Sequence, residues 1–251
     1  MVRDAVSGMN ATEVPRGPAN DDGTLTERAY RLIRADILNV RLAAGQPLRL
    51  EALKDRYGLS FSPIREALNR LRTERLVIAS ALRGFRVAGV SRDEMWDTIE
   101  TRILIEGQAL RRSVERGDDD WEGAVVSAFH AFALCAKRLS AEAAALTGEA
   151  LEEPALEELE RRHRHFHAAL IAACGSPWLL EFSSQLYAQT ERYRRPHLSV
   201  GVGTWAFGTV AREHETIMDA CLAREADRAV TLLSEHYRRT GHFIEQQEDK
   251  G

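Results

Sequence analysis

Hydrophobic residues recur every three or four positions after Thr24, through residues 25–38, which predicts an amphipathic helix. The segment AAGQPLR at 43–49 interrupts this pattern, because its glycine and proline disfavour a continuing helix. A short second helix is expected after this loop and should end at Gly58, since glycine commonly closes helices. The chain is therefore expected to start with two helices separated by a loop.

A third helix is predicted where the chain reads LSFSPIREALNRLRTERLV, and Ser60 or Ser62 can cap its start. The next segment, VIASALRGFRVAGV, has the pattern of two short strands around a turn at Arg83 and Gly84. Two helices, a tight turn, a third helix and a β-hairpin wing together predict a winged helix-turn-helix domain over 24–90.

From Ser91 onward the hydrophobic spacing is helical, and breakers such as Pro196 divide the segment. The predicted helices cover 92–116, 119–146, 155–174, 177–194, 205–223 and 226–246. The sequence thus predicts a mainly α protein, with the winged helix-turn-helix followed by an all-α six- or seven-helix bundle over 91–246. Residues 1–23 have no periodic apolar pattern and are expected to form a disordered tail, with 247–251 as a short C-terminal tail.

The chain has 251 residues, of which 44% are hydrophobic and 29% charged, a composition that excludes a disordered or collagen-like chain. It has no run of about 18 apolar residues, and its N-terminus lacks the basic-then-apolar pattern of a secretory signal. Cys135, Cys174 and Cys221 lie far apart without a CxxC pair, which favours reduced thiols. We therefore expect a cytoplasmic protein without membrane association.

The third predicted helix has an arginine-rich exposed face. In a helix-turn-helix the second helix of the pair enters the major groove, where Arg can bind guanine bidentately and Asn can bind adenine. Serine hydroxyls at its start, basic residues around the preceding helix and the wing tip are expected to contact phosphates or a groove. The expected DNA-contacting residues are Arg49, Lys54, Ser60, Phe61, Ser62, Arg65, Asn69, Arg72, Arg83 and Gly84.

The formal net charge of −4 is a sum of unlike parts. Residues 24–90 carry a net +7, whereas residues 91–251 carry −9 and residues 1–23 carry −2. For any single arginine, an ordinary solvated surface is the alternative to a DNA contact. The concentration of positive charge in one domain favours a polyanion partner, double-stranded DNA, for that domain alone.

The stretch SFSPIREALNRL closely resembles the winged-helix domain of GntR-superfamily transcription regulators, whose recognition helix typically reads S-R-T-P-V-R-E-A-L. The positions that match are Ser60, Pro63, Arg65, Glu66, Ala67 and Leu68. Phe61 stands where the family usually has a base-contacting arginine, and Glu51 stands where a further basic residue is common. A phenylalanine could only touch a thymine methyl or pack on sugar. The resemblance with this departure implies an operator unlike the usual one of the family, or weaker binding.

Four of the eight histidines fall on the inward faces of three predicted bundle helices. His163 and His167 lie four residues apart on one helix face, and His214 and His236 lie on the apolar seams of two later helices. Converging buried imidazoles most commonly bind a transition metal. A single inward histidine is more often a hydrogen-bonded core residue, but four on three helices favour a metal site.

The segment 91–246 resembles the effector domain of the FadR-like subfamily of the same superfamily, the FCD-type helical domain. The metal motif of that subfamily, D-x-x-F-H, then E-H, then a histidine in the last helix, implies His167, His214 and His236 as ligands. His163 replaces the expected aspartate. An all-imidazole site carries less negative charge, which favours Zn²⁺ or Ni²⁺ over Mn²⁺.

The first bundle helix places two charges, Arg102 and Glu106, on its inward stripe, where a plain core would have none. The segment ETRILIE matches the E-x-R-x-x-x-E pattern of the subfamily, and the resemblance implies that Arg102 pairs with a carboxylate of a small effector. An ion pair within the helix, between these two side chains, is the alternative.

Three functions compete on this evidence. The first is a non-enzymatic, ligand-responsive transcriptional regulator, acting as a homodimer on a two-fold DNA operator, with a small carboxylate as effector. The second is a metal-dependent hydrolase, against which we count the expectation that no inward Asp or Glu stands beside the histidines as a general base. The third is a purely structural zinc site.

Overall fold

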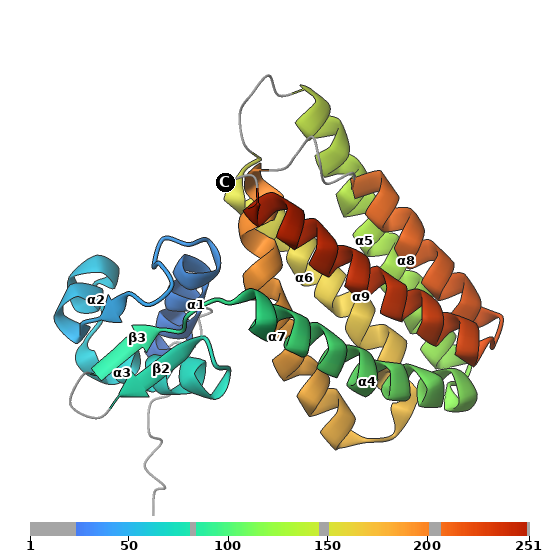
Figure 1. Ribbon diagram of the computed structural model, residues 1–251, viewed down its shortest axis with the longest axis horizontal. Helices are drawn as coiled ribbons and strands as arrows, with labels where there is room; N and C mark the ends of the chain where they lie inside the picture. The colour runs from blue at the N-terminus through green and yellow to red at the C-terminus, as the bar shows by residue number, and fades with distance from the viewer. Residues whose placement is uncertain (1–23, 81–83, 146–150, 201–206, 250–251) are drawn as a thin grey trace, which may run out of the picture.

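The structure is a computed structural model that describes residues 24–80, 84–145, 151–200 and 207–249. It consists of a small N-terminal domain and a larger bundle of long helices, joined by the chain that follows the last strand (Figure 1). The tail predicted at 1–23 and the last two residues of the tail predicted at 247–251 lie outside the described residues. Each domain has its own hydrophobic core.

The N-terminal domain has three helices and a small sheet, as the hydrophobic pattern predicts. Its elements are α1 (Leu25–Leu38), β1 (Pro47–Leu48), α2 (Leu50–Tyr57), α3 (Phe61–Thr73), β2 (Val77–Ser80) and β3 (Gly84–Val87). Thr24 caps α1, its hydroxyl oxygen accepting a hydrogen bond of 3.2 Å from the Glu27 amide. Gly58 ends α2 in the left-handed conformation, with a φ of 65°.

The sheet contains a strand that the sequence did not predict. β1 pairs antiparallel with β3 in the order β1-β3-β2, with Pro47 opposite Arg86 and Leu48 opposite Phe85. A two-residue strand is too short to show an alternating pattern, and its proline reads as a loop signal. Proline is tolerated there because β1 lies at the sheet edge.

Six α-helices and one short 3-10 helix form the second domain in the described residues. They are α4 (Arg92–Arg116), α5 (Asp119–Ala145), α6 (Glu153–Ile171), η1 (Ala172–Cys174), α7 (Pro177–Val200), α8 (Phe207–Leu222) and α9 (Ala226–Glu248). The mainly α fold class predicted from the sequence is therefore confirmed. α9 continues to Glu248, past the predicted end at 246.

The prediction that Pro196 breaks the helix that begins near residue 177 was wrong. α7 passes through Pro196 and reaches Val200, although a proline inside a helix costs about 3 kcal/mol. The turn just before it carries Arg192, Arg194 and Arg195, all of which are buried and hydrogen-bonded to other elements. We attribute the continuation of the helix to these tertiary contacts, which no local pattern reveals.

α5 is the most apolar helix of the bundle. By length and composition alone, its segment Asp119–Ala143 could cross a membrane. The same properties are typical of a core helix. Trp121, Val125, Ala128 and Phe132 are at most 5% exposed and pack inside the bundle.

Candidate functional site

Helix α3, the predicted recognition helix, has a buried side and an exposed side. Ile64, Ala67, Leu68 and Leu71 are fully buried against the rest of the small domain. The opposite side presents Arg65, Asn69 and Arg72, all exposed and, within the described part of the chain, without a side-chain partner.

Other polar side chains of α3 are paired with side chains of α1. Thr26 donates a hydrogen bond of 2.7 Å to Glu66, and Arg70 contacts Glu27 at 2.6 Å while stacking on the Tyr30 ring at 3.6 Å. These pairs hold α1 against α3. They leave the unpaired donors of α3 facing outward, where a groove could receive them.

The serine cap predicted at the start of α3 is not formed by a side-chain hydrogen bond. Ser60 occupies the capping position, but its side chain makes no capping hydrogen bond, and Ser62 reaches Glu66 at 3.4 Å. Both hydroxyls thus leave the helix N-terminus open, which suits a phosphate oxygen. Phe61 is 43% exposed, and the Lys54 ammonium lies 5.2 Å from its ring centre.

The remaining predicted DNA contacts lie around this helix. Arg49 and Lys54 are exposed at the start and in the last turn of α2. Gly84 opens β3 with a φ of 69°, a conformation that favours glycine at the wing turn. Arg83 lies outside the described residues.

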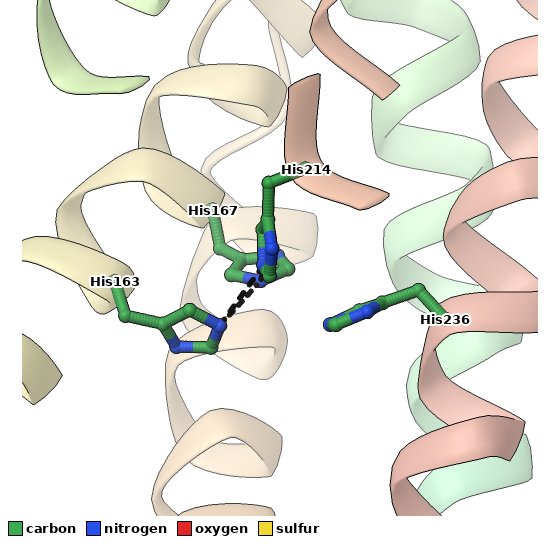
Figure 2. Close-up of side chains that lie close together, drawn as sticks. All are labelled: His163, His167, His214 and His236. Atoms are coloured by element: carbon green, nitrogen blue, oxygen red, sulfur yellow. Dashed lines mark hydrogen bonds between the residues drawn. The ribbon is translucent and has the colours of Figure 1, made fainter. Parts of the chain in front are cut away.

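The four inward histidines come together in the bundle interior, as Figure 2 shows. His163 and His167 project from α6, His214 from α8 and His236 from α9, each at most 4% exposed. One ring nitrogen from each lies within 4.8 Å of the others. The Nε2 atoms of His163, His167 and His214 form a triangle with sides of 3.0, 3.1 and 3.1 Å.

Hydrogen bonds at the opposite ring nitrogens fix which nitrogens can act as ligands. His214 Nδ1 donates to the Val210 carbonyl at 2.6 Å, and His236 Nδ1 to Glu213 at 2.8 Å, so both rings present Nε2 lone pairs inward. Burial raises the pKa of the Tyr237 hydroxyl well above its usual value. That hydroxyl donates to Glu106 and therefore accepts from His167 Nδ1 at 3.0 Å, which gives His167 an inward lone pair too.

Protons alone cannot satisfy the nitrogen triangle. A ring nitrogen either donates or accepts, so three nitrogens facing one another in pairs leave at least one pair with two donors or two acceptors. Here two lone pairs, on His167 and His214, face each other at 3.1 Å. Zinc binds imidazole nitrogen at about 2.0–2.1 Å, and a cation shared by these lone pairs removes the conflict. The donor set therefore fits a divalent transition metal.

Burial keeps these imidazoles neutral. It lowers the pKa of His163, His167 and His214 well below the usual value for histidine. The pKa of His236 falls to about 3, because of burial and then of the nearby positive charges of Arg194 and Arg102. The site is therefore a set of neutral ligands at physiological pH.

Carboxylates do lie near the histidines, and the expectation that none stands beside them as a general base remains a prediction. Glu213, itself in α8, holds His236 Nδ1. The buried Glu106 and Glu160 reach the rings only through Tyr237 and Arg194. Glu213 contacts the ring nitrogen that faces away from the cluster. It orients the imidazole, as carboxylates commonly do behind metal-binding histidines.

The charged pair of the first bundle helix is buried as predicted. Arg102 Nε donates to Glu106 at 2.7 Å, and Arg102 Nη1 donates to Thr190 at 2.8 Å. Ser183 also donates to Glu106, at 2.8 Å. The Arg102 guanidinium lies 4.1 Å from the Tyr237 ring centre. The ion pair within the helix is thus formed in this structure.

A narrow cavity of about 20 Å³ connects this pair with the histidines. Arg102, His163 and His236 line it, and so do Thr190 and Arg194 of α7. Sequence reasoning missed the contribution of α7. Its only signal was the charged run ERYRR at 191–195, which resembles a solvated helix face until the burial of these residues is known.

Comparison with known protein families covers nearly all of the described chain. Residues 97–239 match the FCD domain, and residues 25–87 match the family described as bacterial regulatory proteins, gntR family. These two matches coincide with the helical bundle and with the winged domain.

Relatives and solved structures agree with the family matches. The chain is 41% identical over 213 residues to the HTH-type transcriptional regulator BphR of Paraburkholderia xenovorans, covering 85% of this chain and 82% of BphR. It is 34% identical over 212 residues to the HTH-type transcriptional repressor GlaR of Escherichia coli, covering 82% and 90%.

The solved structure of E. coli McbR/YncC has the same fold, with a TM-score of 0.70, 17% identity and coverage of 90% of this chain and 99% of McbR. A GntR regulator from Rhodococcus sp. RHA1 also shares it, with a TM-score of 0.61, 20% identity and coverage of 87% and 96%. The chain therefore belongs to the GntR family of bacterial transcriptional regulators and carries an FCD domain.

Proposed function

We propose that the chain is a ligand-responsive regulator that binds a palindromic operator as a dimer and whose DNA affinity changes when a small carboxylate occupies a metal-containing pocket in the bundle. The observation that carries this proposal is the convergence of four buried imidazoles beside the Arg102–Glu106 pair. By analogy with GlaR, which is named a transcriptional repressor, we propose repression as the mode of regulation and the cytoplasm as its place.

The metal in this proposal is zinc, with nickel as the second choice, because four neutral imidazoles suit these ions better than manganese. His167, His214 and His236 would hold it through Nε2, and His163 is the fourth candidate. A bound ion of this kind supplies a Lewis-acid position at which a carboxylate oxygen can bind.

The effector in this proposal is a small carboxylate that also reaches Arg102. Glu106 and Thr190 receive three of the five N–H groups of Arg102, so the guanidinium retains donors toward the cavity. The cavity holds only a water-sized molecule in this conformation. Entry of a carboxylate therefore requires the cavity walls on α4 and α7 to separate.

Dimerisation in this proposal uses the outer faces of α4 and α7. Leu104 is 73% exposed, and Trp178, 68% exposed, stacks on Phe182 with ring centres 5.9 Å apart. Large apolar side chains are costly to leave in water, and a second copy of the chain would cover them. A dimer also matches the need of one winged domain for a second half-site.

The alternatives are a metal-dependent hydrolase and a purely structural zinc site. A hydrolase needs a carboxylate or another base facing a metal-bound water. Glu213 instead faces the outer nitrogen of His236, and Glu106 and Glu160 are paired with arginines. This arrangement favours a sensor over an enzyme. Relatives named as transcriptional regulators favour it as well.

One experiment separates the sensor from the structural site. Purified protein is assayed for metal content, and its thermal unfolding is followed with zinc loaded, in the presence of acetate, succinate or citrate. We expect about one zinc per chain and a carboxylate-dependent rise in Tm that is lost in Arg102→Ala. Arg102→Ala also leaves Glu106 without its counter-charge. Arg111→Ala, at a partly exposed arginine of the same helix that pairs with Asp227, is therefore the control for generic charge loss.

The outcomes are distinct. Zinc bound without any carboxylate response would support the structural site, and absence of zinc from protein refolded with the metal would contradict the pocket. Hydrolysis of carboxylic esters or amides by the loaded protein, lost in His167→Ala, would favour the enzyme.

A further inference from the structure

α7 has one face in the histidine site and another against the DNA-binding domain. Thr190 and Arg194 line the cavity beside the histidines. Neighbouring positions reach the small domain: Gln189 donates to the Glu74 carbonyl, Arg192 to the Ala88 carbonyl at 2.5 Å, and Arg195 to Asn39 at 2.8 Å. Figure 1 shows α7 next to α1, on the side of the bundle that faces the small domain.

The centre of this contact is a single buried carboxylate. The side chain of Glu191 is 2% exposed and contacts three arginines from three elements: Arg34 of α1 at 2.7 Å, Arg164 of α6, and Arg195 of α7 at 3.5 Å. Burial would raise the pKa of Glu191, but Arg34 and Arg164 hold it well below the usual value. The carboxylate is therefore charged, and removing it takes the nearest counter-charge from Arg34, whose other carboxylate partner, Glu74, lies 3.6 Å away.

Each arginine connects Glu191 to a different part of the molecule. Arg164 follows His163 directly in α6, so it moves with a ring of the histidine cluster. Arg34 belongs to α1, which packs on the recognition helix through Thr26–Glu66 and Arg70–Glu27. A carboxylate shared by these arginines lies between the histidine cluster and the DNA-reading surface.

The histidine cluster also acts directly on α7. Arg194 Nη1 lies 3.0 Å from His163 Nδ1 and 3.3 Å from its Nε2, and Arg194 Nη2 is paired with Glu160 (the His163 ring is drawn in Figure 2). The same Nη1 lies near both ring nitrogens, and the Tyr187 hydroxyl lies 2.7 Å from His163 Nδ1, so these contacts allow either tautomer of the ring. A divalent cation bound at His163 Nε2 would stand close to the Arg194 guanidinium, and two positive charges in a buried site repel each other. Arg194 must then withdraw, and it lies one helical turn from Glu191.

We propose that Glu191 is the positioning residue that transmits occupancy of the histidine cluster to the DNA-binding domain, through α7 and the Glu191–Arg34 pair. This inference rests on the proposed metal site. Withdrawal of Arg194 displaces α7, which loosens or shifts the shared carboxylate and changes how firmly α1 is held. The effect requires no contact between the bound ion and the small domain.

The chain offers a matched control for this pair. Arg41, in the loop after α1, pairs with Glu153 at the start of α6. That ion pair also joins the two domains, but it does not involve α7, and its side chains are 51% and 32% exposed. If any ion pair between the domains were enough, removing either pair would change the response of the small domain to zinc. If the Glu191 pair transmits the response, only its removal should do so.

The test uses the full chain with zinc alone as the probe. Hydrogen exchange of the amides of α1 and of residues 86–92 is measured with and without zinc, and zinc stoichiometry is determined for each protein. We expect zinc to change exchange of these segments by about fivefold in the wild type, the low end of ordinary coupling between sites. In Glu191→Gln this change disappears while zinc stoichiometry stays at the wild-type value. In Arg41→Gln the change remains.

Glu191→Gln leaves the buried Arg34 with only its longer contact to Glu74, at 3.6 Å, so the double variant Glu191→Gln/Arg34→Gln, which restores a neutral pair, is measured beside it. It is expected to fold and to lose the zinc response in the same way. If the wild type binds no zinc, the proposed metal site and this inference both fail. If it binds zinc and either α1 exchange is unchanged or the Glu191 variants respond like the wild type, only this inference is overturned.

Discussion

The recognition helix and the histidine cluster differ in where their chemistry lies relative to the local fold. α3 buries an apolar stripe and leaves Arg65, Asn69 and Arg72 in solvent, so one helix provides both the scaffold and the donors. The histidine cluster draws on α6, α8 and α9 and is closed from solvent. The geometry of a surface formed by one helix does not change when other helices move. The geometry of a site formed by several helices changes whenever they shift relative to one another.

The difference also appears in the electrostatics. Water and salt screen the charges of the exposed arginines of α3, so each contributes little to the stability of the free protein. Their interactions strengthen only when bound DNA removes this water. In the bundle, burial lowers the pKa of the histidines and places Arg102 and Arg194 against Glu106 and Glu160. Removing one partner of such a pair leaves an uncompensated buried charge, which strongly lowers the free energy of unfolding.

The largest effect is expected from removing two of the imidazoles that form the nitrogen triangle. His167→Ala/His214→Ala should reduce bound zinc from about one ion per chain to none, because the remaining rings cannot complete a site. Metal content after dialysis measures this. His165→Ala, an exposed histidine on the same helix as His167, is the control and should retain the metal. Wild-type stoichiometry in the double variant would show that the cluster is not the metal site.

A smaller effect is expected on the exposed side of the comparison. Arg65→Ala should weaken binding to a cognate operator by about 1–3 kcal/mol, roughly fivefold to 150-fold, without changing the oligomeric state. Fluorescence anisotropy at moderate salt and size-exclusion chromatography measure both properties. Arg70→Ala, on the same helix but paired with Glu27, should cost less affinity. Equal losses in the two variants would contradict the assignment of the base-reading face.

A further effect is a pH dependence of stability to which the buried histidines should contribute. Their folded-state pKa values lie below that of unfolded histidine, so the unfolded chain binds more protons. The metal-free protein therefore loses stability as the pH falls below about 6.5, by up to roughly 1.4 kcal/mol per histidine and pH unit. Thermal unfolding between pH 7.5 and 5 measures this, with zinc removed by a chelator.

Removing one buried imidazole tests that slope. His236→Gln should reduce the pH dependence of Tm. A metal-free protein whose Tm is flat over this range would show that the imidazoles are not buried and neutral in solution.

Much of this molecule follows from short-range pattern. The periodicity around Ala29 and Ile33 predicted α1, the stripe from Ile64 to Leu71 predicted α3, and the inward positions of His163, His167, His214 and His236 followed from the seams of their helices. Helical spacing places residues on one face with little dependence on the rest of the chain. The fold class and the members of the histidine cluster were therefore accessible from the sequence.

Tertiary structure decided the parts that depend on contacts between distant elements. The edge strand at Pro47 exists only because β3 pairs with it, and α7 continues through Pro196 in the setting of its buried arginines. The placement of Arg194 against His163, and of Glu191 between Arg34 and Arg164, joins residues 27 to 157 positions apart. The sequence determined which residues face inward, because helical periodicity is local. Only the packing of α7 against both domains determined which charges meet, because a buried charge must find a partner wherever the fold brings one within reach.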